Sequence, residues 1–310
     1  MDINEVVIVG AGAMGCLFAA KLAECGASVT LVDVDRGRLD SLGRDGITLR
    51  DDEGERTVPV RALTAAQVEG PADLVMLFTK SMHSEAAAAS VGHLARPGVT
   101  ALTLQNGIGN AEALAKTFAP ASILMGVTDF PADLEGPTRI ASHGKGHVRL
   151  GGHVPQAQAA APPVAELFNR SGLETDVDPQ VQAAVWEKVA FNAALNAMAT
   201  VTGLTVGGMD APPGRRIAGA IVGEVVAVAA AHGIELDRAP IDAKVDFAMK
   251  NHRGHKASML QDRLAGRPTE IETINGAVAR FGEARGVATP VTATLADLVR
   301  LLEISDGRRT

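Results

Sequence analysis

Aromatic residues are scarce in this sequence: it has eight Phe, one Trp and no Tyr, together 3% of 310 residues. Proteins that bind single-stranded nucleic acids stack bases on aromatic side chains, and their Lys and Arg residues neutralise phosphates. Here 36 acidic residues outnumber 29 basic ones, which gives a formal net charge of −7. We therefore expect no nucleic-acid partner.

Cysteines and long apolar runs are also few. Cys16 and Cys25 lie nine residues apart on one predicted helix, too far to form a disulfide, and the eight histidines lack metal-site spacing. No apolar run reaches the roughly 20 residues that cross a membrane, and no basic segment followed by a cleavable apolar one begins the sequence. We expect a cytoplasmic protein with no membrane partner, no disulfide and no metal.

A glycine pattern near the start is the strongest motif. The apolar run Val6–Val9 predicts a buried strand, three glycines follow in the order G-x-G-x-x-G, and a helical pattern comes next. Such a loop binds a dinucleotide pyrophosphate: Gly10 allows the tight turn, Gly12 the close approach of phosphates, and Gly15 the packing of helix on strand. The alternative is an ordinary turn between strand and helix. The predicted cofactor-binding residues of the loop are Gly10, Ala11, Gly12, Ala13, Met14 and Gly15.

An aspartate follows the second predicted strand. Asp33 ends the run Ser28–Val32, eighteen residues past Gly15, where an acid accepts hydrogen bonds from the adenosine ribose. Its charge opposes a 2′-phosphate, so NAD is favoured over NADP, although Arg36 and Arg38 could pair with that phosphate. In the alternative interpretation, Asp33 and Asp35 cap the next helix.

The first half of the chain alternates strand and helix patterns, which predicts a Rossmann-type, doubly wound parallel sheet. Ile140 and His147–Leu150, around the glycines at 144 and 146, predict a hairpin that extends the sheet. The acidic run Asp51–Arg56 predicts a solvated turn. The predicted strands are Val6–Val9, Val29–Val32, Leu74–Phe78, Thr100–Leu104 and Ile123–Val127, and the helices are Ala13–Glu24, Glu85–Leu94 and Asn110–Thr117.

From about Pro179 the pattern is helical, and glycine or proline separates most segments. We therefore predict an α/β dinucleotide-binding domain at 1–178 and an all-α substrate domain at 179–310, with a cleft between them. The predicted helices are Val181–Val201, Arg215–His232, Asp242–Met249, Ser258–Ala265, Glu270–Arg285 and Val291–Ile304.

Two segments of the helical half contain candidate chemistry. Lys188, Asn192 and Asn196 are spaced i, i+4 and i+8, so they share one face of a helix that is otherwise apolar or small. Buried polar groups of this kind need partners, which a polar ligand could supply; the alternative is a narrow solvent-facing stripe. In the second segment, Thr269 with Glu272 fits a capping box, and Glu270 would then begin a helix as an ionised carboxylate that could pair with Lys188.

These segments resemble the ketopantoate reductase (2-dehydropantoate 2-reductase) family over almost the whole chain. The shared motifs are GAGAMG at 10–15, TK at 79–80, QNGIG at 105–109, WEKVAFNAALN at 186–196, SMLQD at 258–262 and RPTEIETING at 267–276.

The resemblance implies a role for each matching residue. Lys188 would be the general acid at the substrate ketone, and Glu270 would hold the substrate and Lys188. Lys80 would lie beside the nicotinamide, and Asn106 and Glu270 are also expected near the cofactor. The residues implied to orient the substrate are Asn106, Asn192, Asn196 and Ser258.

The resemblance predicts NAD(P)-dependent reduction of ketopantoate to pantoate, by hydride transfer to the C2 ketone, in a homodimer. Asp33 stands near the position where NADP-preferring members have an Arg, which argues against the family's usual NADP preference. The segments 129–131 and 255–257 are atypical of the family, so the substrate could differ. The first alternative is a related dehydrogenase or reductase of another small hydroxy or oxo acid. The second is a nucleotide-binding sensor without catalysis.

Overall fold

The computed structural model describes residues 3–307, which divide into two compact units. Within the described residues, unit 1 contains 3–105 and 110–181, and unit 2 contains 106–109 and 182–307. The boundary after residue 181 lies close to the one expected after 178. The short segment 106–109, however, belongs to unit 2 although both of its neighbours in the chain belong to unit 1.

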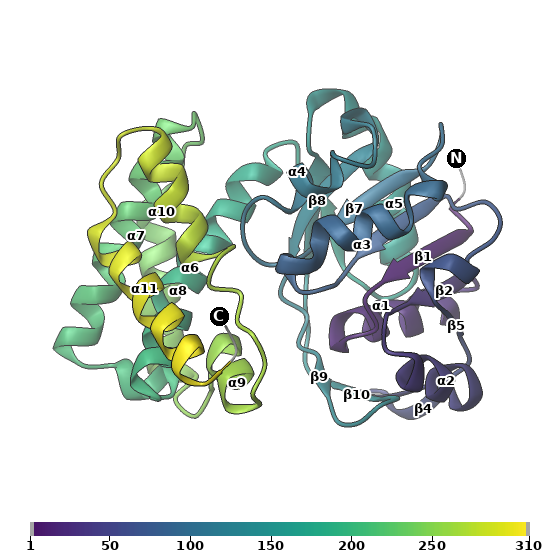
Figure 1. The fold of residues 1–310 in the computed structure, drawn as a ribbon, viewed down its shortest axis with the longest axis horizontal. Coiled ribbons are helices and arrows are strands. Elements are labelled where there is room, and N and C mark those ends of the chain that lie inside the picture. The colour runs from purple at the N-terminus through teal and green to yellow at the C-terminus, as the bar shows by residue number, and fades with distance from the viewer. Residues whose placement is uncertain (1–2, 308–310) are drawn as a thin grey trace. The chain divides into compact units, whose positions relative to one another are not determined.

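Unit 1 is built on an eight-stranded sheet of order β12-β11-β8-β7-β6-β1-β2-β5 (Figure 1). All neighbouring strands are parallel except β8 and β11. The strand order reverses between β1 and β6, which is where doubly wound sheets bind ligands. The strands are β1 (Glu5–Val9), β2 (Ser28–Val32), β5 (Arg61–Leu63), β6 (Leu74–Leu77), β7 (Thr100–Thr103), β8 (Ile123–Thr128), β11 (Val148–Gly152) and β12 (Thr175–Val177).

Strand β1 is buried on both faces, as its apolar sequence predicts. Val6 and Ile8 pack into one core cluster, and Val7 and Val9 pack into another. The helices of unit 1 are α1 (Ala13–Glu24), α2 (Arg36–Asp45), α3 (Ser84–Ser90), α4 (Asn110–Leu114) and α5 (Ala161–Arg170). The sequence patterns predicted neither helix α5 nor strand β12.

The predicted hairpin around Gly144–Gly146 is wrong. Strand β10 (Arg139–Ser142) pairs with β3 (Ile47–Asp51) in a second sheet of order β4-β3-β10-β9, whereas β11 joins the main sheet. The other strands of the small sheet are β4 (Gly54–Val58) and β9 (Asp133–Leu134). Helix α1 contacts β1 and β2 and also the small sheet, which explains why its residues from Gly15 to Ala20 are all buried.

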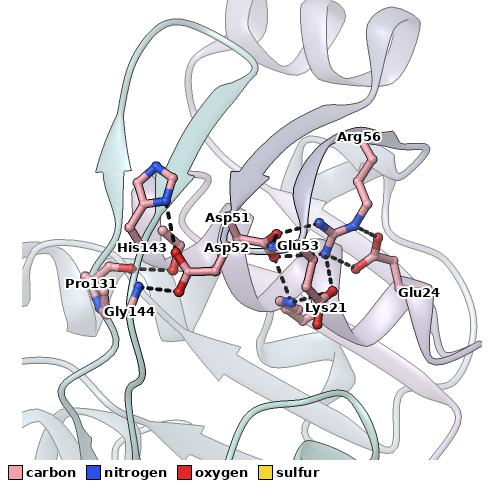
Figure 2. Close-up of polar contacts among 10 residues, drawn as sticks. Lys21, Glu24, Asp51, Asp52, Glu53, Arg56, Pro131, His143 and Gly144 are labelled. Atoms are coloured by element: carbon pink, nitrogen blue, oxygen red, sulfur yellow. Dashed lines mark hydrogen bonds and ion pairs between the residues drawn. The ribbon is translucent and has the colours of Figure 1, made fainter.

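A cluster of charged side chains joins α1 to the β3–β4 turn (Figure 2). Asp51 accepts from Lys21 at 2.9 Å and from Arg56 at 2.8 Å, and Arg56 also pairs with Glu24. The predicted turn at Asp52–Glu53 is present, but the side chain of Asp51 is only 8% exposed, so the run is not wholly solvated. The hydrogen bond from Arg56 holds the pKa of Asp51 well below its usual value.

Asp51→Asn is expected to reduce the free energy of unfolding by about 1–3 kcal/mol near pH 7, because Lys21 and Arg56 lose a charged acceptor. A carboxyl with a lowered folded pKa stabilises the fold above its unfolded pKa of about 3.9, and this contribution is lost as pH falls further. The difference between wild type and variant should therefore shrink below about pH 4. Urea unfolding at several pH values measures it.

Asp52→Asn is the matched control, because the neighbouring Asp52 side chain is 66% exposed. We expect its effect to stay within about 0.5 kcal/mol at every pH. Equal losses in the two variants would contradict the role assigned to Asp51.

Unit 2 is all-helical in its described residues, apart from short helical turns and loops. None of the described helices is long and apolar enough to span a membrane. The predicted fold class, an N-terminal doubly wound sheet and a C-terminal all-α part, is confirmed. The helices are α6 (Val181–Thr202), α7 (Pro212–Ala231), α8 (Arg238–Asn251), α9 (Ser258–Leu264), α10 (Asn275–Ala284) and α11 (Pro290–Ser305).

Helix α6 supplies much of the core of unit 2. Val189, Ala190 and Ala193 are buried, and they join side chains of α7, α8, α10 and α11 in one cluster. A helix that is apolar nearly all round is expected to be buried, and this leaves only a narrow polar face.

Candidate functional site: two sets of polar groups

The glycine loop has the geometry that its sequence predicts. Gly10 has φ +109°, and a Cβ there would lie 2.6 Å from the amide nitrogen of Thr79. A Cβ on Gly15 would lie 1.9 Å from the carbonyl oxygen of Gly10, so only glycine allows α1 to pack this close to the loop. The loop is therefore held tightly against the ends of β1 and β6.

Gly12 differs from the other two glycines, because a Cβ built on it meets no atom within 4 Å. It is the N-cap residue of α1, which has no side-chain cap and no acidic residue in its first turn. The first amides of a helix have no partner within the helix, and they favour an anion. Open space beside such amides fits a dinucleotide pyrophosphate.

Asp33 lies at the carboxyl end of β2 and faces this loop. Its Oδ2 accepts from the amide of Ala11 at 2.7 Å, and its Oδ1 accepts from the amide of Val34 at 2.7 Å. The helix cap is Asp35, which accepts from the amide of Arg38 at 3.1 Å. The capping interpretation therefore holds for Asp35 and is wrong for Asp33, whose carboxylate is fixed beside the glycine loop.

The side chain of Arg38 is directed at α1. Its Nη2 is 3.8 Å from the sulfur of Cys16, and its Nε is buried without a hydrogen-bond partner in residues 3–307. Cys16 is wholly buried, and burial raises the pKa of its thiol. A wholly buried thiol of this kind is expected to be inert.

Lys80 follows β6 and precedes a short helical turn at Ser81–His83. Below it lies a polar network that the sequence did not predict. Gln105 donates to the carbonyl oxygen of Thr79 at 2.6 Å and to Ser84 at 2.9 Å, and Ser84 bonds Asn110 at 3.0 Å. This network fixes the backbone at Lys80. In the sequence, Thr79 and Gln105 stood out only as members of the TK and QNGIG motifs.

Asn106 is placed on unit 2 by the next two residues. Gly107 has φ +92°, and a Cβ there would lie 2.4 Å from the carbonyl oxygen of Thr273. The amide of Ile108 donates to that same oxygen at 2.8 Å. As a result, Nδ2 of Asn106 lies 3.4 Å from Oε2 of Glu270, although 164 residues separate them.

The helix predicted to begin at Glu270 is wrong in its first turn. Residues 270–274 form turns, and α10 begins at Asn275. Thr269 bonds the carboxylate of Glu303 rather than forming a capping box, and Glu272 pairs with Arg300 at 2.7 Å. A tertiary hydrogen bond and an ion pair thus replace the local cap, and Glu270 is only 8% exposed.

The polar face of α6 runs from Lys188 to Asn196. Lys188 and Asn192 are half-buried, and Asn196 is buried with its Nδ2 3.5 Å from the hydroxyl of Ser258. Nδ2 of Asn275 donates to the carbonyl of Ala193 at 3.1 Å, which holds the start of α10 against this part of α6. The contact of 3.5 Å between Asn196 and Ser258 is longer than the usual 2.9–3.0 Å, so it is a weak hydrogen bond.

The predicted residues therefore form two sets. Unit 1 contains the glycine loop, Asp33 and Lys80; unit 2 contains Lys188 and Glu270 with Asn106, Asn192, Asn196 and Ser258. An ammonium, a carboxylate, amides and a hydroxyl can bind and protonate a small oxygen-rich molecule. Within residues 3–307, no group of three or more His, Cys, Asp or Glu could hold a metal ion.

Comparison with known proteins decides the family. Residues 6–155 match the family described as "Ketopantoate reductase PanE/ApbA", and residues 180–303 match "Ketopantoate reductase PanE/ApbA C terminal". The chain belongs to the ketopantoate reductase family. It is therefore an oxidoreductase that acts on CH–OH donors, with a nicotinamide cofactor.

Relatives in this family match nearly the full chain. A 2-dehydropantoate 2-reductase from Halobacterium salinarum is 33% identical over 96% of this chain and 99% of the relative. A 2-dehydropantoate 2-reductase from Streptococcus pyogenes is 32% identical over 96% of this chain and 97% of the relative.

Solved structures agree in fold. The ternary structure of a D-mandelate dehydrogenase with NADH and anilino(oxo)acetate has a TM-score of 0.93 and 30% identity, covering 98% of this chain and 99% of that one. A PanE/ApbA family ketopantoate reductase from Ralstonia eutropha JMP134 has a TM-score of 0.88 and 28% identity, with the same coverage.

Proposed function

We propose that the protein reduces a small 2-oxo acid, with ketopantoate as the first candidate and pantoate as the product. The observation that carries the proposal is the polar set of unit 2. Asn106 lies beside Glu270, and Asn196 lies beside Ser258, on the turn and helix that flank α6. Lys188 and Asn192 stand on the same face of α6.

The chemistry divides between the two units. When bound, the nicotinamide supplies the hydride for the C2 ketone. The glycine loop and Asp33 hold its pyrophosphate and ribose, and Lys80 lies toward the nicotinamide. Lys188 stabilises the negative charge that develops on the ketone oxygen and donates the proton. Glu270 keeps Lys188 and the substrate in place, and Asn192 and Asn196 bind the substrate hydroxyl.

Steady-state kinetics with ketopantoate and with 2-oxoisovalerate tests this proposal. The second substrate lacks the hydroxymethyl group of ketopantoate, so the amides would lose their hydroxyl partner at a cost of about 1–3 kcal/mol. We expect kcat/KM to be about 5- to 150-fold higher for ketopantoate. Asn192→Ala should narrow this ratio. Equal kcat/KM for the two acids in the wild type would show that the amides do not recognise a hydroxyl.

A second candidate is oxidation or reduction of another 2-hydroxy or 2-oxo acid. It is supported by the D-mandelate dehydrogenase structures with NADH, whose TM-scores are 0.93 and 0.90. Turnover of mandelate with NAD, at a higher kcat/KM than that of pantoate, would favour this candidate. The homodimer and the cytoplasmic location stay predictions.

For the cofactor, we propose NAD rather than NADP. Asp33 is fixed beside the glycine loop through the amide of Ala11, and its charge opposes a 2′-phosphate. The wild type should bind NADH more tightly than NADPH. Asp33→Asn keeps a hydrogen-bond acceptor for the amide of Ala11 but removes the charge, so it should reduce the difference between the two affinities. Titration of intrinsic or nicotinamide fluorescence measures both affinities. Tighter binding of NADPH by the wild type would contradict this, and would make Arg36 or Arg38 the candidate phosphate ligand.

A further inference from the structure

The loop between α8 and α9, residues 252–257, is basic and has a fixed backbone. The carbonyl of Arg253 accepts from the amide of Gly207 at 3.2 Å, and that of His255 accepts from Val206 at 2.8 Å. The carbonyl of Lys256 accepts from Nε2 of Gln261 at 2.8 Å. Residues 252–256 are nevertheless exposed, so the loop presents its side chains from a rigid backbone.

Lys256 differs from the other basic side chains near it. Within residues 3–307 its ammonium makes no hydrogen bond or ion pair, although its backbone is anchored. The neighbouring cations are all engaged: Lys244 over the Phe191 ring, Lys250 with Asp246, Arg253 with Asp210, Arg263 with Asp306 and Arg267 with Asp262. A cation without an acidic partner is available to an anion from outside the chain.

The local backbone places Lys256 on the same side as Ser258. Ala257 between them is extended, with φ −56° and ψ 146°, and only 4% exposed, whereas Lys256 and Ser258 are both exposed. Two residues of extended chain span at most about 7 Å. Ser258 in turn lies next to Asn196 on the polar face of α6. We therefore expect the ammonium of Lys256 near Ser258 and Asn196.

We propose that Lys256 binds the C1 carboxylate of the substrate together with Ser258; this inference rests on the proposed 2-oxo acid substrate. The polar set of unit 2 already includes the carboxylate of Glu270, and Lys188 is assigned to the ketone. The amides and the hydroxyl have no net charge, so they alone do not balance a substrate anion. A charge-assisted hydrogen bond from Lys256 would balance the negative charge of the substrate. Such bonds are about twice as strong as neutral hydrogen bonds.

Binding measurements test this without requiring turnover. The probes are 2-oxoisovalerate and its neutral methyl ester, titrated calorimetrically onto the NAD-loaded enzyme. Lys256→Gln should weaken binding of the acid about tenfold and leave binding of the ester unchanged. Lys256→Arg should retain the wild-type affinity for the acid. Lys250→Gln, a charge-matched control at an exposed position of α8, should leave both affinities unchanged.

Several results would overturn the inference: unchanged affinity for the acid in Lys256→Gln, equal loss for acid and ester, or no binding of the acid by the wild type. Kinetics keeps the two proposals apart. If the wild type binds the acid through Lys256 but reduces no 2-oxo acid, the proposed function fails and Lys256 stands. If Lys256→Gln reduces ketopantoate with an unchanged KM, the inference about Lys256 fails alone.

Discussion

Lys188→Ala is expected to lower kcat about 10²- to 10⁴-fold, the usual contribution of a general acid. Hydride arrival at a ketone leaves an alkoxide, and alanine can neither stabilise that charge nor donate the proton. The affinity for NADH should change little, because Lys188 stands on α6 in unit 2 and the glycine loop is in unit 1. Steady-state kinetics and a separate dinucleotide titration measure the two effects.

Lys250→Ala is the control for loss of one positive charge from the same unit, and it should retain the wild-type kcat. A pH profile adds a second readout, since removal of a general acid should also remove the pH dependence that this acid causes. Near-normal kcat in Lys188→Ala would exclude Lys188 from the mechanism. A large rise in the dissociation constant for NADH would instead assign it to cofactor binding.

Gly12→Val is expected to weaken dinucleotide binding strongly without unfolding the protein. Gly12 has φ −70°, which valine adopts, and a Cβ there meets no protein atom within 4 Å. The added atoms would occupy the space in which the pyrophosphate must approach the backbone. Overpacking costs about 1–3 kcal/mol, which corresponds to an increase of about 5- to 150-fold in the dissociation constant.

Gly15→Ala and Gly136→Ala are the variants to compare with Gly12→Val. At Gly15 a Cβ would lie 1.9 Å from a backbone oxygen, so that variant should lose thermal stability as well as binding. Gly136 lies outside the glycine loop, and a Cβ there also meets nothing within 4 Å, so that variant should bind NADH normally. Unchanged NADH affinity in Gly12→Val would show that the dinucleotide does not approach the loop at this residue.

Local patterns predicted the elements around the cofactor loop well. The expected helix Ala13–Glu24 has those bounds in the structure, and each predicted strand of the sheet is present within one residue at either end. The strands are short and mostly apolar, and the helix follows the glycine loop, so local sequence and burial point to the same conformation. The polar face of α6 was predicted for the same reason, since its spacing contrasts with an apolar helix.

Predictions that depended on long-range pairing were wrong. Strands β10 and β11 are separated by a glycine turn typical of a hairpin, yet β10 pairs with β3, about 90 residues earlier in the chain. Likewise, Thr269 and Glu272 fit a capping box, but Glu303 and Arg300 of α11 bind them instead. In both cases a distant partner supplies a better hydrogen-bond or ion-pair geometry than the local alternative, and sequence spacing alone does not reveal it.

The sequence by itself determined the fold class, the dinucleotide loop and the membership of Lys188, Asn192 and Asn196 in one helix face, because all three follow from periodicity and glycine spacing. Only the tertiary structure decided which residues meet them. In the structure, Asn106 belongs to unit 2, and Asp33 accepts a hydrogen bond from the amide of Ala11. Ser258 lies beside Asn196. These contacts join residues 22 to 164 positions apart, and such contacts form only when separate elements pack into one core.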